Sequence, residues 1–76
     1  MVSPHDRRYQ ALLKRLRQAR ADAGLSQVDV AKVLGLVQPL ISRIESGERK
    51  LDPIEFGELC KLYKRGVRYF LPDIPV

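Results

Sequence analysis

Residues 27–46 restrict the fold more than any other part of the sequence, because two short helical patterns flank a glycine there. Ala31 lies in the first pattern, and its small side chain predicts that a neighbouring helix passes close to it. Gly35 follows where the chain must turn sharply, and a left-handed backbone conformation costs glycine little. Ile41 and Ile44 form the inward pair of the second pattern. The segment therefore predicts two short helices joined by a tight turn, which is the geometry of a helix-turn-helix unit.

Glycine and proline residues divide the remaining sequence into further short helices. We expect Ser3 either to cap the first helix, with Pro4 in its first turn, or to fray with the other terminal residues, and we expect Gly24 to end the helix. Asp52-Pro53 begins a later helix that we expect to end at Gly66, and a short helical or irregular segment follows. The residues expected to face the core recur at helical spacing: Tyr9, Leu12, Leu13, Leu16, Ala19, Ala23, Val30, Ala31, Leu34, Ile54, Phe56, Leu59, Cys60, Leu62 and Tyr63. The sequence thus predicts an all-α fold, a compact bundle of four to five short helices.

Length and composition are typical of one small globular domain. The chain has 76 residues, one cysteine and 45% hydrophobic residues. We expect residues 9–71 to form the domain, residues 1–8 to extend its first helix, and residues 72–76 to form a C-terminal tail. The longest uncharged stretch, residues 33–42, is too short to cross a membrane. The lone Cys60 and the absence of a signal-peptide pattern favour a cytoplasmic protein.

The second helix of the corner is expected to present a polar face to the outside. If its two isoleucines point inward, the helix period turns the following residues outward: Gln38, Pro39, Ser42, Arg43 and Ser46. Glutamine can bond adenine through two atoms, arginine can bond guanine or phosphate, and serine accepts several partners, so this face suits a DNA major groove. The net charge of +5 favours a polyanionic partner. An ordinary solvated helix face is the alternative interpretation.

Together these features resemble the phage repressor and Cro type of helix-turn-helix domain, also called the XRE family. The resemblance covers about residues 9 to 71 and is carried by Arg17, Arg20, Gly24-Leu25-Ser26-Gln27, Val30-Ala31, Leu34-Gly35, Gln38, Ile41-Ser42-Arg43-Ile44-Glu45, Gly47 and Arg49. It implies a transcriptional regulator that binds double-stranded DNA, probes the major groove with the helix starting near Gln38, and acts as a homodimer on two half-sites.

The resemblance also implies a role for individual positions. DNA base contacts are expected from Gln38, Pro39, Ser42 and Arg43. DNA phosphate contacts are expected from Gln27, Ser46, Arg49 and Lys50, for which a plain surface role is the alternative. Gln27 is further expected to brace Gln38, and Arg20 is expected to form a largely buried ion pair with Glu45.

Two positions depart from the family pattern. Val37 occupies the place where the family usually has serine or threonine as a helix cap. Pro39 and Leu40 replace polar residues that commonly stand beside the first glutamine, and they either contact thymine methyl groups or only pack. The first turn of this helix is therefore less polar than the resemblance would lead us to expect.

Nothing in the sequence predicts an enzyme, a metal site or a cofactor. His5 has no partner at ligand spacing, and Cys60 is expected to be a small core residue. Tyr69, Phe70 and Leu71 are expected either to complete the core or to form a dimer surface. If they form a surface, the alternative function is a protein-interaction module, such as an antitoxin or accessory protein, that uses the same fold to bind a protein partner.

Overall fold

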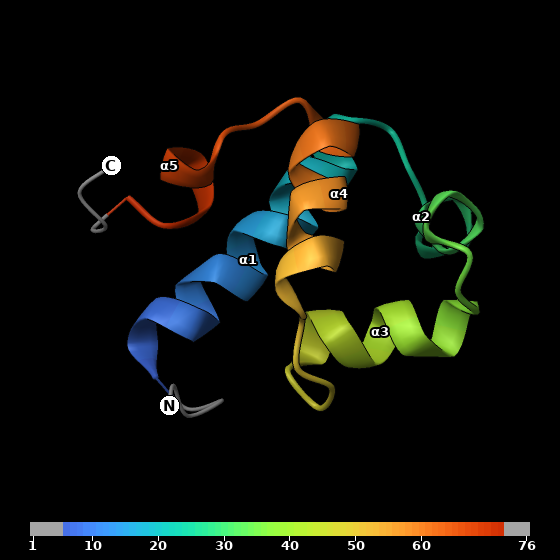
Figure 1. Ribbon diagram of the computed structural model, residues 1–76, viewed down its shortest axis with the longest axis horizontal. Coiled ribbons are helices and arrows are strands. Elements are labelled where there is room, and N and C mark those ends of the chain that lie inside the picture. The colour runs from blue at the N-terminus through green and yellow to red at the C-terminus, as the bar shows by residue number, and fades with distance from the viewer. Residues whose placement is uncertain (1–5, 73–76) are drawn as a thin grey trace.

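The structure is a computed structural model that describes residues 6–72. It contains the helices α1 (Arg7–Asp22), α2 (Gln27–Leu34), α3 (Gln38–Ser46), α4 (Pro53–Tyr63) and α5 (Val67–Phe70), arranged as Figure 1 shows. There is no strand within residues 6–72. This confirms the all-α bundle of short helices that the sequence predicts. None of the described helices is long and apolar enough to cross a membrane.

The starts of the helices follow from short-range sequence. Ser26 caps α2 by accepting a hydrogen bond from the Asp29 backbone N–H at 3.1 Å, while the Asp29 carboxylate accepts one from the Ser26 N–H at 2.9 Å. Asp52 caps α4 in the same reciprocal way with Glu55. Such a capping box satisfies two backbone donors that the first turn of a helix leaves open. The expected cap at Ser3, together with Pro4, lies outside the described residues, and the N-cap of α1 is Asp6.

The end of α4 differs from the prediction. Gly66 does not end this helix, because α4 stops at Tyr63 and Lys64 takes the left-handed C-cap conformation with φ of 56°. The turn closes when the Lys64 and Arg65 N–H groups donate to the carbonyls of Lys61 and Cys60. Closing the turn satisfies carbonyls that the last helical turn would otherwise leave unpaired. Gly66 is instead the N-cap of α5.

The core lies between α1, α4, α5 and the α2–α3 corner. Its buried residues are Leu12, Leu13, Leu16, Ala19, Val30, Ala31, Ile41, Ile44, Leu59, Tyr63 and Phe70. Two residues expected in the core are not there, since Ala23 is exposed and Ile54 is 76% exposed. Ala23 is the C-cap that follows the last turn of α1, and Ile54 lies in the first turn of α4, before the buried part of that helix.

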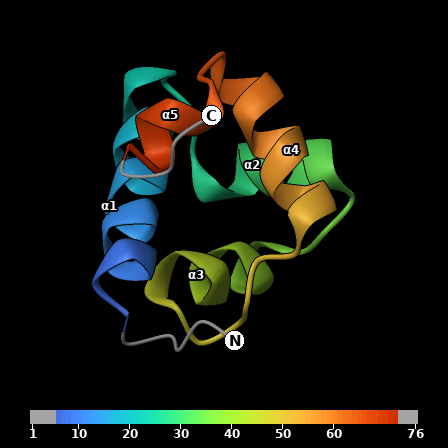
Figure 2. The same ribbon diagram turned by 60° about the vertical axis from the view of Figure 1, so that its left-hand side comes forward.

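The C-terminal aromatic segment completes the core. Phe70 has no exposed surface, and its ring meets Phe56 and Tyr69 edge to face, with centroids 5.5 and 4.9 Å apart. Tyr69 and Leu71 are only partly buried. Of the two roles expected for this segment, the structure gives Phe70 the core role and removes it from any surface. Figure 2 shows that α5 and α3 lie at opposite ends of the molecule, with α1 beside both.

Candidate nucleic-acid interface

The corner between α2 and α3 has the form that the sequence predicts. Gly35 ends α2 with φ of 67°, and the Leu36 N–H donates to the Ala31 carbonyl at 2.9 Å, which closes the turn. Ala31, Ile41 and Ile44 are at most 3% exposed. A small residue at the crossing and two inward isoleucines therefore bring the helices into contact, and they fix which side of α3 is left outside.

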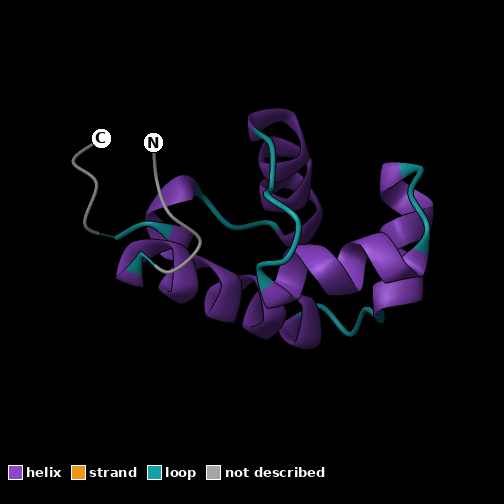
Figure 3. Ribbon diagram, turned by 90° about the horizontal axis from the view of Figure 1, so that it is seen from below, coloured by secondary structure: helices purple, strands orange, loops and turns teal. Residues whose placement is uncertain are grey.

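The outward face of α3 is uncovered. We use this term for Gln38, Pro39, Ser42, Arg43 and Ser46, all of which are exposed except the half-buried Gln38. Figure 3 views the molecule from below and looks onto α3. The only acid of this helix, Glu45, points inward and is 5% exposed. Leu40 is half-buried, so it packs in part against the protein, whereas Pro39 remains on the surface.

Gln38 is half-buried because it is tied to Gln27 at the start of α2. The Gln38 Nε2 group donates to the Gln27 Oε1 atom at 2.7 Å. Gln27 in turn donates from Nε2 to the Glu45 Oε1 atom at 2.9 Å. An amide carries two N–H donors and one acceptor oxygen, so Gln38 keeps a donor and an acceptor beyond this bond. A donor next to an acceptor is what the N7 and N6 atoms of adenine require.

Glu45 joins the outward face to α1 through an ion pair. Arg20 donates to the Glu45 carboxylate from Nε at 2.7 Å and from Nη2 at 3.1 Å. The bond to Glu45 raises the pKa of Arg20 above its usual range. Arg20 also donates from Nη1 to the Leu25 carbonyl at 3.0 Å. Arg20, Glu45, Gln27 and Gln38 thus form one continuous chain of hydrogen bonds, which we call the Arg20–Gln38 network.

Sequence reasoning found this network only in part. The resemblance implied the Arg20–Glu45 pair and the contact between Gln27 and Gln38, and the structure contains both. It did not find that Arg17 donates from Nη1 to the Glu45 carbonyl at 2.7 Å, which adds a second tie between α1 and α3. The basic residue at Arg17 was a visible signal, but its partner becomes clear only once the helices are placed.

Of the residues expected to contact phosphate, three lie at the end of α3 or in the loop after it, whereas the half-buried Gln27 starts α2. Ser46 is exposed, and its hydroxyl donates to the Arg43 carbonyl at 3.1 Å. Lys50 is exposed in the loop that follows. Arg49 holds both carboxylate oxygens of Glu55, at 2.9 and 3.0 Å, and this bond raises the pKa of Arg49. These two hydrogen bonds orient the Arg49 guanidinium. Glu55 was not predicted from the sequence as a partner of Arg49.

The described residues also bear on two other kinds of site, a metal centre and a reactive cysteine. Residues 6–72 contain no group of three or more histidine, cysteine or acidic side chains that could hold a metal ion. Cys60 is half-buried on α4, and burial raises the pKa of its thiol, which disfavours the reactive thiolate. His5 lies outside the described residues.

The chain is similar to a known protein family. A family model described as a helix-turn-helix domain matches residues 11–68. The matched range includes most of α1, all of α2, α3 and α4, and therefore the whole Arg20–Gln38 network. No curated protein matches the chain.

Proposed function

Because the chain belongs to the helix-turn-helix domain family, we propose that it is a sequence-specific transcriptional regulator of the phage repressor and Cro type. In this proposal it binds double-stranded DNA and inserts α3 into the major groove. One observation carries the proposal: the outward face of α3 is polar, free of acids and uncovered, while the Arg20–Gln38 network holds its first residue from beneath. A pre-positioned side chain loses less freedom on binding, which favours discrimination between bases.

The proposed contacts divide into two groups. Gln38, Pro39, Ser42 and Arg43 contact base edges. Gln27, Ser46, Arg49 and Lys50 contact phosphates, which position the protein but carry no sequence information. The bond to Glu55 does not prevent the Arg49 contact, since a guanidinium has five N–H donors and this bond uses two nitrogen atoms.

We propose a homodimer, because one copy reads too little DNA. At 1.5 Å per residue, the nine residues of α3 extend about 13 Å, which spans about four base pairs. Two copies on half-sites about 34 Å apart, one helical turn of DNA, double the sequence that is read. Residues 9–71 are the proposed DNA-binding unit.

The test begins with selection of bound duplexes from a random pool, followed by a footprint that shows one half-site or two. Gln38→Ala is then expected to weaken binding to the selected site by about 1–3 kcal/mol and to remove discrimination at one base pair. The matched control is Gln18→Ala, because Gln18 is an exposed glutamine of α1 that bonds only to Asp22 within its own helix. If Gln38→Ala weakens binding to random and selected duplexes equally, the base contact is wrong.

A second measurement separates phosphate contacts from base contacts. Lys50→Gln is expected to weaken binding to all duplexes alike and to reduce the slope of log affinity against log salt by about one. Lys32→Gln, an equal charge change at an exposed position of α2, is expected to leave the slope nearly unchanged. A complex whose affinity does not respond to salt would contradict DNA binding through phosphates.

A further inference from the structure

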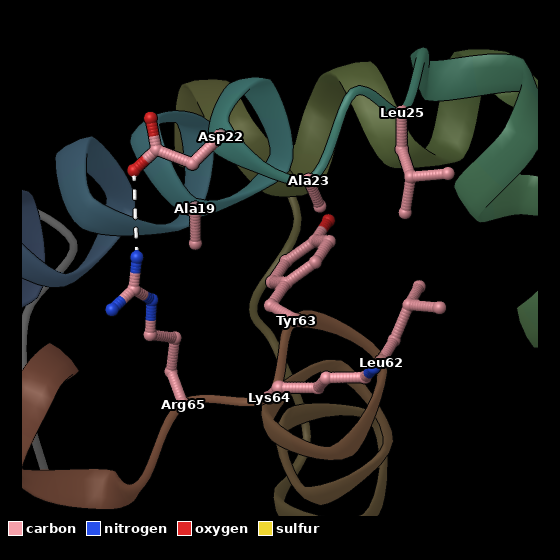
Figure 4. A pocket seen from close by; sticks show the side chains of 8 residues that line it. All are labelled: Ala19, Asp22, Ala23, Leu25, Leu62, Tyr63, Lys64 and Arg65. Atoms are coloured by element: carbon pink, nitrogen blue, oxygen red, sulfur yellow. Dashed lines mark ion pairs between the residues drawn. The ribbon is translucent and has the colours of Figure 1, made fainter.

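A pocket of about 390 Å³ opens where the ends of α1 and α4 meet the connection between α1 and α2. Figure 4 shows the side chains that line it: Ala19, Asp22, Ala23, Leu25, Leu62, Tyr63, Lys64 and Arg65. Its volume falls in the range of about 300–1,000 Å³ that is usual for small-molecule sites. None of the lining residues has a place among the proposed DNA contacts, so the pocket is a separate feature of the molecule.

Tyr63 places an unused hydroxyl in this pocket. The residue is only 6% exposed, and Figure 4 shows its hydroxyl directed into the space beside Ala23. No group in the described part of the chain is hydrogen-bonded to this hydroxyl, whereas the Tyr9 hydroxyl accepts a bond from the Leu51 N–H at 3.1 Å. Among the described residues, no fully buried side-chain nitrogen or oxygen atom lacks a hydrogen-bond partner, so the unbonded Tyr63 hydroxyl keeps some exposed surface and is open to the pocket. Burial raises the pKa of Tyr63 to about 12, so the hydroxyl stays protonated and can donate.

The rim of the pocket carries charge with an excess of one cation. Arg65 and Asp22 face each other with a nitrogen to oxygen distance of 3.7 Å, and both side chains are more than 40% exposed. Such a long, solvated ion pair contributes little stability and exchanges easily for another partner. Lys64 adds a second positive charge to the lining, and Figure 4 shows its side chain extending away from the Arg65–Asp22 pair toward Leu62. The remaining lining residues are apolar: Ala19, Ala23, Leu25 and Leu62.

We propose that this pocket binds a small carboxylate that has an apolar body, such as a short aliphatic acid or an aromatic acid. The carboxylate accepts a hydrogen bond from the Tyr63 hydroxyl and lies on the Arg65 side of the pocket, while Lys64 adds positive charge at the opposite edge. The apolar body packs on the alanine and leucine side chains. A hydroxyl donor, an excess positive charge and apolar walls match this class of ligand and fit a cation or a fully polar molecule poorly. The proposal goes beyond DNA binding and does not depend on it.

The test uses benzoate and hexanoate as probes, with benzamide and hexanamide as neutral controls of the same shape. The probes are titrated into the isotope-labelled chain, and backbone amide shifts are followed by NMR. We expect saturable shifts at Ala19, Ala23, Leu62 and Arg65, and affinity about tenfold lower for the amides. Equal binding of acid and amide would overturn the proposal, as would shifts that do not saturate or that spread over the whole surface.

Variants then assign the contacts. Tyr63→Phe is expected to weaken acid binding by about tenfold or more, since a hydrogen bond to a charged group is lost. The matched control is Tyr69→Phe, which removes a hydroxyl outside the pocket and is expected to leave affinity unchanged. Lys64→Asn and Arg65→Gln each remove a rim charge, and asparagine tolerates the left-handed conformation at position 64. Their spectra without ligand report folding. If Tyr63→Phe binds benzoate as tightly as the original chain, the proposed site is wrong.

Discussion

Glu45→Gln removes one negative charge, and almost no volume, from the side chain that joins three helices. Glu45 is 5% exposed and accepts two bonds from Arg20 and one from Gln27. A glutamine at this position has one acceptor oxygen, and its NH₂ group must face donors of either Arg20 or Gln27. At least one donor then meets another donor inside the protein. The change therefore leaves the Arg20 guanidinium without its counter-charge and disrupts its hydrogen bonds.

The loss of stability in Glu45→Gln depends on the interactions that Arg20 keeps. Removing one partner of a buried ion pair costs about 3–5 kcal/mol, because the other charge is stranded. Arg20 retains its bond to the Leu25 carbonyl, and its side chain is 20% exposed. We therefore expect the lower end, a loss of about 3 kcal/mol. For a domain of this length that loss lowers Tm by roughly 12–24 °C.

Thermal and urea unfolding followed by circular dichroism measure this loss. The control is Asp6→Asn, the same loss of charge at a surface ion pair whose arginine side chain is 62% exposed. Asparagine also caps a helix as well as aspartate does, so this variant is expected to unfold close to the original chain. Combining Arg20→Met with Glu45→Leu is expected to restore part of the stability, since no charge is then stranded. A loss below about 1 kcal/mol in Glu45→Gln would refute the reasoning.

Three further changes test local parts of the fold by the same unfolding measurements. Gly47→Ala is expected to cost about 1–3 kcal/mol, because φ is 89° there and a Cβ would lie 3.1 Å from Leu13 Cδ1. Gly57 lies inside α4, and a Cβ there meets nothing within 4 Å, so Gly57→Ala is expected to raise the free energy of unfolding by about 0.5–1 kcal/mol. A lower free energy of unfolding would show that the added methyl group does not fit. Because the fold raises the pKa of Tyr63, this residue contributes to stability. The contribution is intact below pH 10.0, the ordinary pKa of tyrosine, and is lost as the pH rises toward about 12. Urea unfolding below and above pH 10 measures this change in the free energy of unfolding. Tyr63→Phe should lose less stability across that pH change than the original chain. Equal losses in the two proteins would contradict the prediction.

The fold was predictable from sequence to the extent that short-range chemistry determines it. Gly35 ends α2 where a left-handed residue was expected, and Asp52-Pro53 begins α4 as expected. These features depend on neighbours within four residues, so the sequence displays them directly. The end of α4 was missed because Lys64 adopts a conformation that usually favours glycine.

The candidate site was less predictable, because its geometry depends on contacts between distant helices. Helical period alone predicts that Gln38 and Ser42 face outward; Ser42 is exposed in the structure, whereas Gln38 is half-buried by its bond to Gln27. The two-point bond between Arg49 and Glu55 has no sequence signal beyond the capping box that contains Glu55. The pocket at Tyr63 was also missed, since helical spacing predicts burial of that ring but does not say whether its hydroxyl has a partner.

The start of α3 is the place where the departure from the family pattern has a measurable consequence. Val37 is its N-cap, is 61% exposed, and makes no side-chain hydrogen bond to the helix. Pro39 in the first turn has no N–H, so the nearest donor that a cap can satisfy is the Leu40 N–H, which now contacts only the Val37 carbonyl at 3.0 Å. Val37→Thr keeps the shape of the side chain and supplies an acceptor for that donor. We expect a gain of about 1 kcal/mol, or a rise in Tm of roughly 4–8 °C.

A matched valine distinguishes capping from a general effect of threonine. Val33 is 54% exposed inside α2, where threonine and valine have similar helix propensity and no cap is needed, so Val33→Thr is expected to leave Tm nearly unchanged. An equal rise in both variants would show that capping is not the cause. No rise in Val37→Thr would show that Pro39 and the bond between Gln38 and Gln27 already hold the first turn. In that case the uncapped start of α3 does not lower stability, because the Arg20–Gln38 network stabilises the first turn in place of a cap.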